Sequence, residues 1–187
     1  MGLFSPFAQE LETRRLSMSP WRLSDSEAVR GLWAERDSRS LRVIDADGRP
    51  TVDVTRLRIQ EQHEESARTG LALLAIERKG EGEFIGYCGV IIGASTLAEP
   101  EIVYERFQSA HGNGYATEAA QAVLAAALDT GRSRLWATVR CWNAPSFRVR
   151  EKIGCARSGK IDRDPHCGDM VWMTGPCDPA GSSLHNL

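Results

Sequence analysis

Residues 111–120 read HGNGYATEAA, a loop with two glycines directly before an alanine-rich segment, and this stretch decides the fold. Alanine is the strongest helix former, so the stretch predicts a loop at 111–114, here called the glycine loop, followed by a helix. The N–H groups of a first helical turn lack partners, and glycines carry no Cβ that would keep a ligand away. With the positive end of the helix dipole, these amides favour a phosphate or pyrophosphate. The alternative is that the glycines only turn the chain.

Three apolar runs precede the glycine loop, and turn residues separate them. They are LALLAIER at 71–78, EFIGYCGVII at 83–92 and EPEIVYERF at 99–107. Their aliphatic and aromatic content, broken by GEGE and GASTLAEP, predicts three consecutive antiparallel strands.

Two helices and a short strand are predicted nearer the N-terminus. The strand covers about 13–18, and the first helix follows it with Ser24 and Glu27 as a capping box. The second helix runs from about Arg56 to Thr69 and ends at Gly70. The polar stretch at 38–54 between the helices is irregular, and we expect it to contain a binding site for an acceptor molecule.

After the glycine loop the hydrophobic period becomes helical. One face of this helix is expected to carry Tyr115, Ala119, Ala122, Val123 and Ala126, and Gly131 ends it. A strand at 134–141, a short helix at 143–154 and a final strand at 169–174 follow, with one further strand possible. This order predicts an α/β fold with a mixed sheet and helices on both faces.

Composition narrows the class of protein. The chain has 187 residues, 42% hydrophobic and 26% charged, with a net charge of −2, which is typical of one soluble globular domain. We expect that domain to cover 1–176, and 177–187 to form a flexible tail. The charge argues against nucleic acid as a partner, and the lack of an apolar run of 18 residues argues against a membrane span.

The five cysteines are odd in number and never spaced as C-x-x-C. This favours neither a disulfide framework nor a metal site, so we expect no bound metal and a cytoplasmic protein. Cys141, at the end of a predicted strand, is expected to be buried as a small apolar group rather than to act as a nucleophile.

Several blocks in order resemble the GNAT superfamily of N-acetyltransferases, in particular its ribosomal-protein N-terminal acetyltransferase branch. HGNGYATEA is similar to WGxGYATEA, with Gly114 and Ala116 at the phosphate motif Q/R-x-x-G-x-G/A and His111 as a departure from its first position. ETRRLSMSPWRLSDSEA, FIGYCGV, EPEIVY and NAPSFRVREKIGC are similar to further blocks of the branch. The resemblance spans about residues 12–174.

The resemblance implies a sheet splayed between its fourth and fifth strands, which hold the pantetheine arm of acetyl-CoA. It implies cofactor contacts along the fourth strand, in the glycine loop with the start of its helix, and at the following helix. These cofactor-binding residues are Tyr104, Glu105, Arg106, Phe107, His111, Gly112, Asn113, Gly114, Tyr115, Ala116, Thr117, Asn143 and Phe147. Asn143 also suits the N-cap of its helix.

Direct acetyl transfer to a primary amine needs a base for the ammonium group and a proton for the departing thiolate. The resemblance implies Glu101 as the base, with Glu99 or a water as alternatives, and Ser146 as the proton donor. The amine is that of a protein N-terminus or of a small molecule, and the protein is a monomer or a homodimer. A non-catalytic acyl-CoA sensor is the alternative function, while a dinucleotide-dependent oxidoreductase is disfavoured by the order of elements.

Overall fold

The computed structural model describes residues 4–7, 9–37, 39 and 50–175. Within them, eight strands form one sheet in the order β1-β2-β3-β4-β5-β6-β8-β7. The strands are β1 (Leu11–Glu12), β2 (Leu16–Pro20), β3 (Leu73–Arg78), β4 (Glu83–Ile91), β5 (Glu101–Arg106), β6 (Trp136–Arg140), β7 (Ala156–Asp162) and β8 (Met170–Thr174). The helices are η1 (Leu23–Asp25), α1 (Ser26–Ala34), α2 (Val52–Thr69), η2 (Gln108–Ala110), α3 (Tyr115–Asp129) and α4 (Ala144–Lys152).

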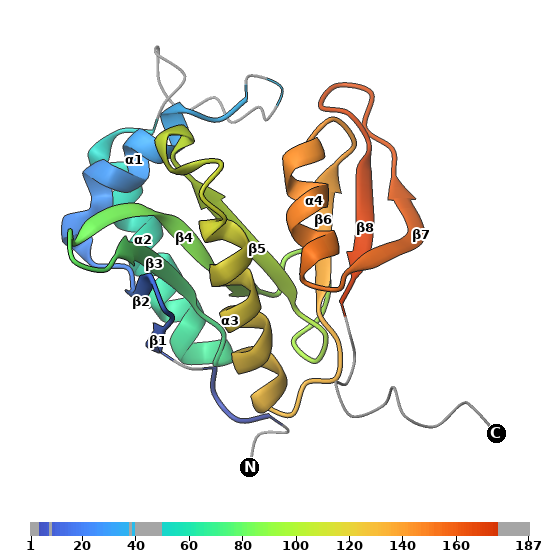
Figure 1. Cartoon of the computed structure of the whole chain (residues 1–187), viewed down its shortest axis with the longest axis horizontal. Coiled ribbons are helices and arrows are strands. Elements are labelled where there is room, and N and C mark those ends of the chain that lie inside the picture. The colour runs from blue at the N-terminus through green and yellow to red at the C-terminus, as the bar shows by residue number, and fades with distance from the viewer. Residues whose placement is uncertain (1–3, 8, 38, 40–49, 176–187) are drawn as a thin grey trace.

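The predicted mixed sheet is confirmed, and its mixture comes from one place. All neighbouring strands are antiparallel except β5 and β6, which are parallel and paired only at Glu101 and Trp136. Figure 1 shows the consequence: β6, β7, β8 and α4 form an arm that diverges from the rest of the sheet. β5 and β6 are the strands predicted at 99–107 and 134–141, the fourth and fifth of the sequence prediction, so this is the splay that the resemblance implies.

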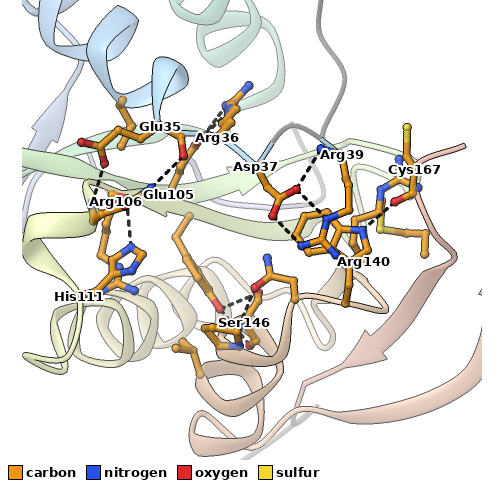
Figure 2. Close-up of a pocket in the computed structure, with 18 residues that line it drawn as sticks. Glu35, Arg36, Asp37, Arg39, Glu105, Arg106, His111, Arg140, Ser146 and Cys167 are labelled. Atoms are coloured by element: carbon orange, nitrogen blue, oxygen red, sulfur yellow. Dashed lines mark hydrogen bonds and ion pairs between the residues drawn. The ribbon is translucent and has the colours of Figure 1, made fainter.

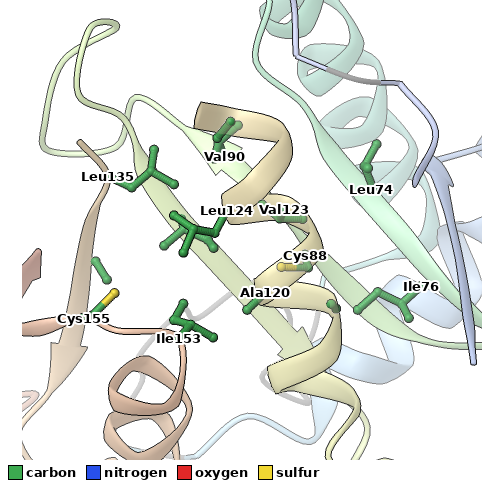
Figure 3. Close-up of a cluster of buried hydrophobic side chains, with 14 of the residues drawn as sticks. Leu74, Ile76, Cys88, Val90, Ala120, Val123, Leu124, Leu135, Ile153 and Cys155 are labelled. Carbon is green, nitrogen blue, oxygen red and sulfur yellow. The ribbon is translucent and has the colours of Figure 1, made fainter. Parts of the chain in front are cut away.

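Helices cover both faces of the sheet. α3 lies against β4 and β5, where Ala120, Val123 and Leu124 pack among apolar side chains of the strands and of α4 (Figure 3). On the other face, α1 and α2 enclose a smaller cluster that contains Trp21, Val29, Ile59 and Ala75. Two cores therefore pack on opposite faces of the other arm of the sheet, which contains β1 to β5.

The buried face of α3 differs from the predicted one. Ala116, Ala119, Ala120, Val123, Leu124 and Ala127 are its buried residues. Tyr115, Ala122 and Ala126 are only partly buried and pack at the edge of the core. Alanine stands on both the predicted and the observed face, so the apolar pattern alone does not decide which face meets the sheet.

The start of α1 is also different. The predicted capping box of Ser24 and Glu27 is wrong, because the Asp25 carboxylate accepts the Arg22 N–H at 2.7 Å and closes a turn of η1 before α1 begins. α2 begins at Val52, four residues earlier than expected, since Thr51 caps it, and it ends at Gly70 as predicted. Cys141 is exposed, so its expected burial is wrong; the tail at 177–187 lies outside the described residues.

The glycines of FIGYCGV permit close strand approach in the sheet. A Cβ on Gly86 would lie 2.1 Å from the Glu105 carbonyl oxygen, and one on Gly89 would lie 2.2 Å from that of Ala72. Both distances are far below van der Waals contact, so β4 can pack between its neighbours only with glycine at these positions.

We expect Gly89→Ala to lower the free energy of unfolding by about 1–3 kcal/mol, because the added methyl meets backbone that cannot move aside. Gly31→Ala is the matched control. Its Cβ would meet only the Phe107 ring at 3.6 Å, and it removes a glycine from α1, so it should be neutral or stabilise by up to about 1 kcal/mol. Urea unfolding of both variants provides the measurement, and equal losses would contradict the assignment of Gly89.

Candidate functional site

A pocket of about 910 Å³ lies where the two arms of the sheet diverge. It is bounded by the C-terminal end of α1, the end of β5, the end of β6 and the start of α4 (Figure 2). Its lining residues are Leu32, Glu35, Arg36, Asp37, Arg39, Tyr104, Glu105, Arg106, Gln108, His111, Arg140, Trp142, Asn143, Pro145, Ser146, Val149, Cys167 and Met170.

Unpaired backbone of β5 faces this pocket. The Pro100 carbonyl accepts the Trp136 N–H at 2.9 Å, and the Ile102 carbonyl accepts a hydrogen bond from Arg150 at 2.7 Å, so both point away from β4. Backbone groups alternate in direction along a strand, which puts the N–H and C=O of Tyr104 on that same side. The edge of β5 therefore offers strand-like hydrogen bonds to an extended ligand.

The glycine loop leads into α3 beside this edge. Gly112 and Gly114 have φ values of 79° and 78°, a left-handed conformation that favours glycine. A Cβ on Gly112 would meet no atom within 4 Å, and Gly114 provides no side-chain cap for the first turn of α3. The first-turn N–H groups thus have no side-chain cap, and such groups favour an anion.

Glu118 ties this loop to the N-terminal hairpin, a role that the sequence did not reveal. Its carboxylate accepts hydrogen bonds from the Thr13 hydroxyl at 2.7 Å, the Arg15 N–H at 3.0 Å and the Arg15 Nε at 2.7 Å. Arg15 also donates to the Asn113 carbonyl at 3.0 Å and stacks over the Tyr115 ring at 4.7 Å. Burial raises the pKa of Glu118, but the bonds from Thr13 and Arg15 outweigh it and lower that pKa.

Two side chains lie between the loop and β5. The His111 Nε2–H donates to the Arg106 carbonyl at 3.3 Å, which satisfies another backbone group of the open strand edge. Arg106 lines the pocket, and its Nε is buried with no hydrogen-bond partner among the described residues. Burial lowers the pKa of Arg106, which still leaves a cation beside the glycine loop.

The start of α4 closes the opposite side of the pocket. Asn143 caps the helix, because its side chain accepts the Ser146 N–H at 3.2 Å, and it also lines the pocket. Ser146 Oγ lies 3.1 Å from the Tyr104 hydroxyl, which also donates to the Ser146 carbonyl at 3.2 Å. Three of the predicted residues therefore meet at this wall.

Glu101 lies outside the pocket lining. Its side chain is 3% exposed, and its carboxylate accepts the Ala94 N–H at 2.7 Å and the Thr138 hydroxyl at 3.0 Å. Glu99, its alternative, is half-buried and accepts the Trp136 indole N–H at 2.9 Å. The structure thus places Glu101 at the closed end of the splay, where β5 and β6 still pair.

The α1 side of the pocket holds an ion pair that the sequence did not reveal. Arg36 binds Glu105 with both Nε, at 2.6 Å, and Nη2, and the Tyr87 hydroxyl donates to the same carboxylate at 3.0 Å. Burial lowers the pKa of Arg36, but its hydrogen bonds to Glu105 outweigh burial and raise that pKa, so Arg36 stays charged. The charged run 35–37, directly after an amphipathic helix, was the available signal.

A second charged group lines the wall beyond β6. Arg39 stacks over the Trp142 ring at 4.1 Å, and Arg140 donates to Asp164 at 2.7 Å and to the Gly168 carbonyl at 2.6 Å. In Figure 2 Arg39 and Arg140 lie on the side of the pocket away from His111. Most of the acceptor region predicted at 38–54 falls on 38 and 40–49, outside the described residues.

The predicted residues do not all reach the pocket. Tyr104, Glu105, Arg106, His111, Asn143 and Ser146 line it. Phe107 instead packs edge-on against Phe84, with ring centroids 6.2 Å apart, and Phe147 is buried beside Arg157. Asn113, Ala116 and Thr117 belong to the glycine loop and the first turn of α3, beside the pocket lining.

The chain is similar to known acetyltransferases. The family model described as acetyltransferase (GNAT) domain matches residues 15–156. An uncharacterised protein of Bacillus subtilis, YkkB, is 37% identical over 96 residues, which are 49% of this chain and 55% of that protein, so the match spans about half of this curated relative.

Solved structures extend the similarity to nearly the whole chain. An acetyltransferase of Agrobacterium tumefaciens is 28% identical, covers 93% of this chain and 97% of its own, and has a TM-score of 0.70. RimJ of Mycobacterium smegmatis, solved in complex with CoA-disulfide, is 23% identical, covers 92% and 86%, and has a TM-score of 0.71. None of the helices in the described part of the chain has the length and apolar character needed to cross a bilayer.

We expect Glu118→Gln to lower the free energy of unfolding by about 1–2 kcal/mol at neutral pH, because three hydrogen bonds lose their charged acceptor. The lowered pKa means that this stabilisation is present above the ordinary pKa of glutamate and is lost as the pH falls through the folded-state value. Urea unfolding from neutral to acidic pH should show the difference from wild type shrinking. A difference independent of pH would contradict the ionic role.

Proposed function

Because the chain belongs to the acetyltransferase (GNAT) domain family, we propose that it transfers the acetyl group of acetyl-CoA to the nitrogen of a primary amine. The observation that carries this proposal is the proximity of two features, one that lines the pocket and one that lies beside its lining. The open edge of β5 suits an extended pantetheine arm, and the uncapped first turn of α3 suits a pyrophosphate. RimJ, which shares the fold, was solved with a CoA derivative.

The residues present fit acetyl-CoA. The amides of residues 112–117 would hold the pyrophosphate, with the Arg106 cation beside them, and the backbone of Tyr104 would hold pantetheine. Asn143 and Ser146 would lie near the thioester, whose polarised carbonyl is the chemistry that the bound molecule supplies. Phe147 would support this site from the core rather than touch the ligand, because it is 7% exposed.

Two side chains are proposed to move protons. Ser146 is the donor for the sulfur, since its hydroxyl lines the pocket at the start of α4. Glu101 is the base, and because its carboxylate is buried it would act on the amine through a water. The same carboxylate accepts a hydrogen bond from the Thr138 hydroxyl at 3.0 Å. Glu101 starts β5, whereas Ser146 lies on α4 and contacts Tyr104 farther along β5, so different elements would serve the amine and the sulfur.

The acceptor is proposed to be a polar amine, from a protein N-terminus or a small molecule. The wall formed by the residues after α1, the end of β5 and the end of β6, here called the acceptor wall, presents carboxylates and guanidinium groups rather than an apolar surface. These lining groups are Glu35, Arg36, Asp37, Arg39, Glu105 and Arg140. A single domain acting in the cytoplasm, as a monomer or a homodimer, completes the proposal.

Calorimetric titration with acetyl-CoA and with NADPH, followed by release of free thiol with a panel of amines, tests this function. We expect acetyl-CoA to bind, NADPH not to bind, and thiol release to depend on the amine. Tight binding without turnover on any amine would support an acyl-CoA sensor. Binding of NADPH alone would overturn the proposal.

We expect Gly114→Val to abolish detectable acetyl-CoA binding, because a branched side chain at the start of α3 would obstruct the amides. Gly131→Val is the matched control at the other end of this helix. Both glycines have positive φ, 78° and 88°, and neither has backbone within 4 Å of an added Cβ, so both variants should lose similar stability. Calorimetry with each variant decides the matter, and normal binding by Gly114→Val would exclude the pyrophosphate assignment.

For Glu101→Gln we expect a rate lowered by about 10²- to 10⁴-fold, the usual contribution of a general base. A base must be ionised to act, so the wild-type rate should fall as the pH drops through its pKa, and the variant should lack this acidic limb. Glu99→Gln is the control and should retain the limb. If the profiles of wild type and Glu101→Gln coincide, another group is the base.

A further inference from the structure

Arg150 is a buried cation that neither the anion site nor the acceptor wall explains. Its side chain is 3% exposed, and one nitrogen, Nη2, donates to the Ile102 carbonyl at 2.7 Å. Its Nε and Nη1 are buried with no hydrogen-bond partner among the described residues, so no carboxylate of that part of the chain binds them. A buried guanidinium without a counter-ion is unfavourable, so its charge calls for a reason.

The charge lies directly against Tyr104. The Arg150 guanidinium carbon is 4.3 Å from the centroid of the Tyr104 ring, and the Tyr104 hydroxyl is 3.1 Å from Ser146 Oγ. Ser146 and Arg150 are four residues apart on α4 and therefore share one face of the helix. This face presents a hydroxyl at the pocket and a cation behind it, with Tyr104 touching both.

We propose that Tyr104 is a further catalytic residue, which supplies the proton for the departing thiolate together with Ser146, and that Arg150 is a positioning residue that stabilises the phenolate left behind. This inference rests on the proposed acetyl transfer. It differs from a lone Ser146 donor because an alcohol is a far weaker acid than a phenol. Ser146 alone would have no ready source for the proton it gives away.

The step balances as follows. The amine nitrogen forms a bond to the acetyl carbon while the bond from that carbon to sulfur breaks, and the electron pair of the broken bond stays on sulfur. Sulfur takes the Ser146 proton. The Tyr104 O–H turns from the Ser146 carbonyl, 3.2 Å away, to Ser146 Oγ, 3.1 Å away, and gives its proton to that oxygen. Tyr104 becomes a phenolate, and it regains a proton from the one that the acceptor nitrogen releases to solvent.

The groups facing Tyr104 leave Arg150 as the main buried charge. Cys88 lies opposite it on β4, and burial raises the pKa of this thiol to about 12, so it is neutral at neutral pH. Arg106, two residues along β5, is a second cation, but it lines the pocket. Burial raises the pKa of Tyr104 and keeps it a protonated donor, while Arg150 and the Ser146 hydrogen bond act to lower that pKa.

A purely structural role for Arg150 makes a different prediction. If its only task were to satisfy the Ile102 carbonyl at the splay, a neutral amide donor would serve as well. Arg150→Gln keeps a donor and removes the charge, whereas Arg150→Lys keeps the charge. Arg148→Gln is the matched control, since it removes the same charge from an exposed position of the same helix.

Titration of Tyr104 tests the coupling without any turnover. The chain has three tyrosines, so replacement by a difluorinated tyrosine, with Tyr104→Phe to assign the signal, makes the phenol visible by fluorine NMR. Arg150→Gln should raise the pKa of Tyr104 by about one to three pH units, the usual effect of a charge at this distance. Arg148→Gln and Arg150→Lys should leave it nearly unchanged. An unshifted pKa in folded Arg150→Gln would overturn the role of Arg150.

Kinetics tests whether the coupling serves the reaction. Tyr104→Phe keeps the ring over Arg150 and removes only the hydroxyl, and it should lower kcat by about 10²-fold, the lower range for a general acid, while leaving KM for acetyl-CoA within about twofold. A general acid must be protonated, so the basic limb of the wild-type pH profile should move to higher pH in Arg150→Gln and disappear in Tyr104→Phe.

The double variant shows whether Arg150 acts through Tyr104. In a Tyr104→Phe background, Arg150→Gln should lower kcat no further, whereas independent effects would multiply and overturn the inference. Urea unfolding of each variant verifies that the fold is retained. If Arg150→Gln does not fold, Tyr104→Phe, which keeps Arg150, still tests the catalytic role of Tyr104. If the wild type turns over none of the amines, the acetyl transfer itself is refuted. If the wild type turns over an amine and Tyr104→Phe does so at the same rate, this inference alone is refuted.

Discussion

The structure depends on the early separation of β5 from β6. Parallel strands normally share hydrogen bonds along their length, but here pairing stops at Glu101 and Trp136. Every backbone group beyond that point needs another partner, because a buried unpaired amide is costly. Arg150 serves the Ile102 carbonyl and His111 serves the Arg106 carbonyl, while the backbone of Tyr104 faces the pocket. The opening is therefore built into the sheet, and side chains hold it open.

Much of this architecture could be predicted from the sequence, because its strongest signals are local. Gly70 ends α2, alanine-rich residues form α3, and the three runs before the glycine loop form β3, β4 and β5. The wrong or missing predictions also concern short segments, where neighbouring residues could play the same role or the strand has no apolar side. Asp25 rather than Ser24 organises the start of the first helical segment, and β7 gave no apolar signal because its residues are exposed.

The site was predictable only in part, for a physical reason. The glycine loop, Asn143 and Ser146 carry their geometry in short motifs, so their meeting at one pocket could be expected. The pair of Arg36 and Glu105 joins residues 69 positions apart, and no local pattern encodes such a contact. Likewise, Glu101 was predicted from its place on the strand, but its burial comes from the loop whose Ala94 N–H binds it.

The contact of Glu118 with Thr13 spans 105 residues of sequence, although it holds only a short loop in place. Closing so long a loop costs conformational entropy, which disfavours the early formation of such a contact in folding. The amides of the glycine loop would therefore reach their final geometry only after the N-terminal hairpin has docked on α3. In kinetic terms, phosphate binding at the proposed site would report completed folding, and intermediates that already contain α3 would not compete for the ligand.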